Sequence, residues 1–158
     1  MNCGDIEMAI KRHYDPRRNL IVPNVSWGFG VHECDMLVVS KSGYATEIEI
    51  KVSKGDLIKD AKKEHKHESR KICRLYFAIP KSLSEKIGND VELMIPSGAG
   101  LIEVSEEGNL HFRIIAKDKN RYKLTVQEMY VVARLGAIKY WSIREKLEYL
   151  IKNPAVKI

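Results

Sequence analysis

The chain has 158 residues, of which 44% are hydrophobic and 30% charged, and its formal net charge is +6. This length and composition suit one globular domain with one core, and they exclude a disordered chain. No apolar run approaches the roughly 18–20 residues that a membrane-spanning helix needs, so we expect no membrane partner.

The N-terminal stretch and the cysteines give two further expectations. The N-terminal stretch carries early acidic residues and lacks the apolar segment of a secretory signal. Cys3, Cys34 and Cys73 are odd in number and widely spaced, which argues against a disulfide framework or a zinc site. A cytoplasmic location is therefore expected, because the cytoplasm keeps thiols reduced.

In chain order, the first part of the sequence predicts a helix and then strands. Apolar residues share one face over residues 4–14, which favours a short amphipathic helix. Residues 20–31 mix β-forming residues with Pro and Gly and predict an irregular strand or hairpin. Two alternating segments, 34–40 and 44–52, flank the turn "KSG" and predict a β-hairpin.

A second helix is expected directly after this hairpin. Ser53 has the character of an N-cap, and Asp56 stands three residues later, as in a capping box. The helix is expected over 54–69. A buried strand over 73–79 and a short helix from Ser82 follow.

The C-terminal part predicts two more strands and two helices: 100–104, 109–116, 125–135 and 140–152. Gly136 predicts a break between the two helices. The order of elements predicts an α/β fold with a mixed β-sheet flanked by helices. We expect one domain over 1–158, with 123–158 as a helical C-terminal extension.

The segment "EIEIK" carries charge on an otherwise apolar strand. Glu47, Glu49 and Lys51 stand at every second position, so all three point to one face of the strand. Asp35 lies on the strand before it in the predicted hairpin. Two explanations remain open from the pattern alone: a solvated sheet edge or a metal site.

The metal interpretation is chemically coherent. Mg²⁺ prefers oxygen ligands, and it commonly takes one or two carboxylates together with water and substrate phosphate. Asp35 and Glu49 can supply the carboxylates, and the backbone carbonyl of Ile50 can supply a third oxygen. Lys51 can orient a water or offset charge on a phosphoryl group. These parts describe metal-assisted phosphodiester hydrolysis.

The same residues resemble the PD-(D/E)XK nuclease superfamily, and within it most closely the MmcB-like DNA-repair group. The likeness rests on "CDMLVVSKSG", "EIEIKVSKGDLIKDAKKEH", "CRLYFAIP" and "IPSGAGLIEV", which together span residues 33–104. In this sequence "HECD" stands where the family usually has a proline before the aspartate.

The resemblance implies a restriction-endonuclease-like core that cuts DNA with Mg²⁺ or Mn²⁺. It implies Asp35 and Glu49 as metal ligands and Lys51 as the catalytic lysine. It also implies an acid from the first helix, for which Glu7 is the matching residue. Because enzymes of this family commonly act as dimers, a homodimer is a further expectation.

A basic stretch follows the charged strand and favours a nucleic-acid partner. Nine Lys and Arg residues lie between Lys51 and Arg74 with four acids, which leaves a charge of +5 in this stretch. The expected nucleic-acid-binding residues are Lys54, Lys59, Lys62, Lys63, Lys66 and Arg70. A solvated helix with i,i+4 ion pairs explains the same charges. Asp60 and Lys62 fall in the helix motif of the resemblance, and a surface ion pair explains Asp60 equally well.

Other polar and aromatic residues have plainer interpretations. Glu47 is expected at the surface, and His32 reaches the site only if the fold brings it there. Aromatic residues of the C-terminal helices are expected in helix packing, with a dimer surface as the alternative: Tyr130, Tyr140, Trp141 and Tyr149.

The sequence therefore predicts a metal-dependent DNA endonuclease acting in repair, restriction or a mobile element. The main alternative is a non-catalytic nucleic-acid-binding module that keeps the nuclease fold. An interaction protein whose helical tail binds a partner is a third interpretation.

Overall fold

The computed structural model describes residues 1–61 and 69–153. Its helices are α1 (Cys3–Tyr14), α2 (Lys54–Ala61), α3 (Lys81–Ile87), the 3-10 helix η1 (Gly88–Met94) and α4 (Val126–Lys152). Its strands are β1 (Leu20–Val25), β2 (Cys34–Val39), β3 (Ala45–Ile50), β4 (Arg74–Pro80), β5 (Gly100–Val104) and β6 (Leu110–Ile114).

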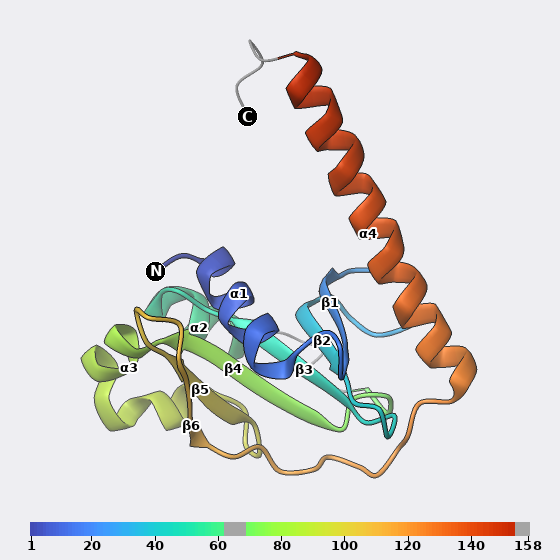
Figure 1. The fold of residues 1–158 in the computed structure, drawn as a ribbon. Helices are drawn as coiled ribbons and strands as arrows, with labels where there is room; N and C mark the ends of the chain where they lie inside the picture. The colour runs from blue at the N-terminus through green and yellow to red at the C-terminus, as the bar shows by residue number, and fades with distance from the viewer. Residues whose placement is uncertain (62–68, 154–158) are drawn as a thin grey trace.

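The strands form one mixed sheet in the order β1-β2-β3-β4-β5-β6, as Figure 1 shows. The β3–β4 and β4–β5 pairs are parallel, and the other three pairs are antiparallel. Parallel neighbours need a crossover connection. The segment that contains α2 links β3 to β4, and α3 with η1 links β4 to β5. The predicted α/β class with a mixed sheet and flanking helices is confirmed.

Helices cover both faces of the sheet. On one face, α1 packs its buried residues Ile6, Ala9 and Ile10 against the even-numbered residues of β3. The opposite face carries two apolar clusters, one beneath the first half of α4 and one beneath α2 and η1. The odd-numbered residues of β3 point to this second face, so its charged row lies between two apolar clusters.

The C-terminal helix corrects two predictions. α4 is continuous across Gly136, where a break was predicted. A single glycine in a helix interior costs only about 1 kcal/mol, and packing of α4 on β1 offsets that cost. The second half of α4 projects beyond the sheet (Figure 1). Four aromatic residues of α4 are 56–61% exposed: Tyr130, Tyr140, Trp141 and Tyr149. The predicted packing of these rings within the chain is therefore wrong.

Candidate active site

Asp35, Glu49 and Lys51 come together where β2 begins and β3 ends. The β2–β3 register sets Met36 opposite Ile48, which brings Asp35 opposite Glu49 on the next strand. Lys51 follows β3 directly and points to the same face as Glu49. The structure thus gathers the three residues that the sequence proposed as a site.

Lys51 is the centre of this group. Its Nζ lies 2.5 Å from Oε2 of Glu49, 3.2 Å from Oδ2 of Asp35 and 3.3 Å from Oδ1 of Asp60. The side chains of Lys51, Glu49 and Asp60 are 10%, 2% and 2% exposed, whereas that of Asp35 is 35% exposed. We call Asp35, Glu49 and Asp60 the acidic cluster.

The acidic cluster decides the charge state of Lys51. Burial alone would lower the pKa of the Lys51 ammonium, because a charged group loses its hydration. The hydrogen bond to Glu49 and the charges of Glu49, Asp35 and Asp60 outweigh burial and hold that pKa above its ordinary value. Lys51 is therefore a cation at neutral pH, and it can act through its charge but not as a base.

The acidic cluster gathers three carboxylates around one ammonium. Within residues 1–61 and 69–153, Asp35, Glu49 and Asp60 all contact Lys51, in a largely buried position. A cavity of about 490 Å³ opens beside them and is lined by Cys3, Asp35, Ile50, Lys51, Val52, Asp56, Lys59 and Asp60. A dissolved cation thus has access to a site of negative potential.

Asp35 is held in a fixed orientation at the mouth of this cavity. Its Oδ2 accepts a hydrogen bond of 2.7 Å from the backbone N–H of Ile50 as well as the contact with Lys51. Glu7 of α1 lies within electrostatic reach, because burial and the charge of Asp35 together raise the pKa of Glu7. The acid that the resemblance implied on the first helix thus lies near Asp35.

For Asp60 the sequence left two interpretations open, a role in the helix motif of the resemblance and a surface ion pair. The structure contradicts the surface pair, because Asp60 is buried and contacts Lys51 from α2. Leu57 and Asp60 are three residues apart and therefore share the inward face of α2. Leu57 packs on the sheet, which brings Asp60 onto Lys51. That spacing was the signal that could have identified Asp60.

Glu47 is also buried, so its predicted surface position is wrong. Its Oε1 lies 2.9 Å from Nε2 of His32, which comes from the loop between β1 and β2. A buried carboxylate needs a hydrogen-bonding partner, and His32 is such a partner. His32 lies in a loop, whose position cannot be predicted from the periodicity of the sequence. Glu47 and His32 extend the polar row of β3 away from Lys51.

The predicted nucleic-acid-binding residues are only partly described. Lys54 and Lys59 are exposed on α2, and Lys59 lines the cavity. Arg70 is exposed and its guanidinium lies 5.8 Å from the ring centre of Tyr122. Lys62, Lys63 and Lys66 lie outside the described residues. The predicted cap of α2 is confirmed by the reciprocal hydrogen bonds of Ser53 and Asp56.

The donor set fits a hard divalent cation. The acidic cluster offers only oxygen ligands, which suits Mg²⁺ or Mn²⁺. Within residues 1–61 and 69–153, no three His, Cys, Asp or Glu side chains are arranged as ligands of one metal ion. A site of two carboxylates, a carbonyl and water, as expected for Asp35, Glu49 and Ile50, requires no such triplet.

Comparison with known proteins gives a fold neighbour. No family model and no curated protein matches the chain. A solved structure of a protein of unknown function from Silicibacter pomeroyi superposes with a TM-score of 0.58 at 17% identity. The match covers 97% of this chain and 92% of that protein, so the two share a fold over nearly their whole length. In the described part of the chain, no helix has the length and apolar character to cross a membrane.

Proposed function

We propose that the protein is a metal-dependent DNA endonuclease. The observation that carries this proposal is the acidic cluster, whose three carboxylates converge on Lys51 beside an open cavity. Buried ionisable groups are costly to keep, and they gather at sites where a cation or a reaction uses them. The resemblance of residues 33–104 to PD-(D/E)XK nucleases, which rests on the same residues, favours the same assignment.

Each residue of the site has a role that follows from its position. Asp35 and Glu49 would hold the ion together with the carbonyl of Ile50, and Asp60 and Glu7 would add negative charge around them. When bound, Mg²⁺ polarises a phosphodiester and lowers the pKa of a water. Lys51 is charged and anchored, so it contributes fixed positive charge where the phosphoryl group becomes more negative.

A cleavage assay on supercoiled plasmid tests the proposal. The wild-type protein is expected to nick DNA with Mg²⁺ or Mn²⁺ and to lose activity with a chelator. Asp35→Asn, Glu49→Gln and Lys51→Met are each expected to lower the rate by about 100-fold or more. Glu85→Gln and Lys86→Met on α3 are matched controls of the same chemical types. Retained cleavage in all three site variants would contradict the proposal.

Metal binding can be measured without turnover. Titration of the protein with Mn²⁺, followed by the electron paramagnetic resonance of the free ion, is expected to show one site in the wild type. That site should be lost in the Asp35→Asn/Glu49→Gln double variant and kept in Glu85→Gln. A site that survives in the double variant would show that the ion binds elsewhere.

A non-catalytic nucleic-acid-binding module is the second candidate. The observation in its favour is that the ammonium of Lys51 already stands between Asp35 and Glu49, where it neutralises part of their charge. This candidate predicts salt-dependent DNA binding with no cleavage in Mg²⁺ or Mn²⁺. The plasmid assay therefore separates the two functions directly.

A further inference from the structure

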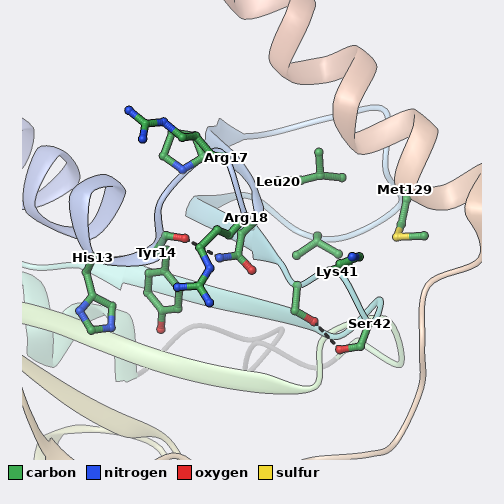
Figure 2. Close-up of a pocket in the computed structure, with 12 residues that line it drawn as sticks. His13, Tyr14, Arg17, Arg18, Leu20, Lys41, Ser42 and Met129 are labelled. Carbon is green, nitrogen blue, oxygen red and sulfur yellow. Dashed lines mark hydrogen bonds between the residues drawn. The ribbon is translucent and has the colours of Figure 1, made fainter.

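A second cavity lies at the other end of the sheet and differs in charge from the first. It has a volume of about 1120 Å³ and lies between the end of α1, the loop before β1 and the turn between β2 and β3 (Figure 2). Its lining residues are His13, Tyr14, Pro16, Arg17, Arg18, Asn19, Leu20, Val39, Ser40, Lys41, Ser42 and Met129. We call it the basic cavity.

The charged side chains that line the basic cavity are all positive. Arg17, Arg18 and Lys41 line it, and no Asp or Glu does. Within the described residues, these three cations form no ion pair, whereas Arg74, Arg113 and Arg144 each contact a carboxylate. Cations that line one concave surface repel one another, and an anion relieves that repulsion.

The segments that carry these cations are held in place by hydrogen bonds. Asp15 accepts from the N–H of Arg17 through its side chain at 3.0 Å, and from the N–H of Arg18 through its carbonyl at 2.9 Å. The side-chain amide of Asn19 donates to the carbonyl of Tyr14, as Figure 2 shows. The loop therefore presents both arginines before any ligand arrives, which lowers the entropic cost of binding.

The turn that carries Lys41 is equally fixed. Gly43 adopts a φ of 88°, and its N–H donates to the carbonyl of Ser40 at 2.9 Å. The hydroxyl groups of Ser40 and Ser42 are hydrogen-bonded to each other at 2.9 Å, as Figure 2 shows. Both hydroxyl groups line the cavity beside Lys41 and can also donate to an anion.

The shape of the basic cavity suits a polymer. Pockets for small ligands enclose their ligand. This cavity is open to the surface, and its cations come from two separate segments. Arginine and serine side chains along an open groove suit successive phosphates of a nucleic-acid backbone.

The position of the basic cavity relates it to the acidic cluster. α1 contributes Cys3 to the first cavity and His13 and Tyr14 to the second. Cys3 and His13 are ten residues apart in α1, which corresponds to about 15 Å along the helix axis. Along a duplex this distance corresponds to roughly four to five base pairs at about 3.4 Å each.

We propose that the basic cavity binds the phosphate backbone of a nucleic acid through Arg17, Arg18 and Lys41. On the proposed nuclease function, it holds the duplex about four base pairs from the scissile bond. The binding itself does not depend on cleavage, so the two proposals can fail separately.

Binding of a fluorescent 20-base-pair duplex, followed by anisotropy with a chelator present, tests the inference. Arg17→Ala/Arg18→Ala is expected to weaken binding by at least tenfold and to reduce the slope of log K against log salt by about two. The matched control is Lys86→Ala/Lys117→Ala, which removes two exposed lysines elsewhere and should leave affinity and slope unchanged. Circular dichroism and the thermal midpoint check that both variants fold.

Competition identifies the source of the phosphate. Excess unlabelled duplex is expected to displace the probe from the wild type. Inorganic phosphate and a nucleoside monophosphate, each at the same phosphate concentration, are expected not to displace it. A slope that is unchanged in Arg17→Ala/Arg18→Ala would overturn the inference, and so would displacement by the monophosphate alone. Loss of binding in this variant, with cleavage intact in Asp35→Asn, would support the basic cavity and overturn the proposed active site.

Discussion

Lys51 and the carboxylates around it connect stability and function at the scale of single residues. Glu49 and Asp60 are almost fully buried, and Lys51 is a cation within 3.3 Å of both. A buried carboxylate without a counter-charge is strongly unfavourable, so the fold depends on this lysine. Substitutions that change one charge at a time should therefore have opposite effects on stability.

Replacing Lys51 with Met is expected to destabilise the fold by about 3–5 kcal/mol, because two buried carboxylates lose their cation. Urea denaturation at neutral pH measures this change. In the wild type, the raised pKa of Lys51 gives a stabilisation that is complete below its unfolded value of 10.5 and is lost only as pH rises through the folded value.

The Lys51→Met variant should depend on pH in a different range. Without the cation, the folded state favours protonated carboxyl groups and binds more protons than the unfolded state. Its stability should therefore fall as pH rises from about 5 to about 8, a range in which Lys51 gives the wild type a constant contribution. Equal stability of variant and wild type across this range would contradict the charge arrangement described here.

Replacing Asp35 with Asn is expected to leave stability unchanged or to increase it. Asp35 is more exposed than the other two carboxylates, and its removal reduces the repulsion among the carboxylates. The Asn oxygen can still accept the hydrogen bond from the N–H of Ile50. The same urea titration checks this, and a loss as large as that of Lys51→Met would show that the cluster has no such repulsion to relieve.

The sequence predicted part of this site and missed part, for a physical reason. The alternation of β3 places Glu47, Glu49 and Lys51 on one face whatever the rest of the fold does. Burial of that face depends on how α2 and the loop before β2 pack over the sheet, and the local alternation of β3 does not predict that packing. The positions of Asp60 and His32 were therefore left open. The residues that they contact, Lys51 and Glu47, were identified as members of one face.

At the scale of elements, α4 shows how tertiary packing overrides a local signal. Glycine lowers helix propensity, and Gly136 predicted a break between two helices. The first half of α4 buries Val132 and Leu135 against β1 and β2, which stabilises one continuous helix. The two helices were correctly predicted as helical, and the packing that joins them is visible only in three dimensions.

Gly136→Ala is expected to stabilise the protein by about 0.5–1 kcal/mol, because alanine lowers the entropic cost of the helix. A Cβ at this position would lie 3.5 Å from Cγ2 of Val22, an ordinary contact distance. Gly100→Ala is the matched control. A Cβ there would overlap the ring of Tyr76, so a loss of about 1–3 kcal/mol is expected. Chemical denaturation compares the two, and destabilisation by Gly136→Ala would indicate a kink at this residue.

At the scale of the whole molecule, the second half of α4 carries apolar side chains that a partner can cover. Ile143, Leu147 and Ile151 are 51–66% exposed, on a half-helix that projects beyond the sheet (Figure 1). Tyr140, Ile143, Leu147 and Leu150 repeat at spacings of three, four and three, which is a coiled-coil seam. Such a seam is complementary to itself, so a second copy of the chain related by a two-fold axis fits it.

The expected state in solution is therefore a homodimer joined through α4. Light scattering after size exclusion should give twice the chain mass of 18.1 kDa. Ile143→Glu/Leu147→Glu should give a monomer, because burying two carboxylates in an apolar seam costs more than the seam contributes.

Lys152→Glu is the matched control, since it changes the net charge by the same amount away from the seam. It should remain dimeric, because Lys152 lies outside the seam and one charge at the rim of an interface contributes little. Circular dichroism should show that the Ile143→Glu/Leu147→Glu variant keeps its sheet while its helix signal falls, since the freed half of α4 loses its support. A wild-type monomer with full helix content would contradict pairing through this seam and would show that α4 is stable alone.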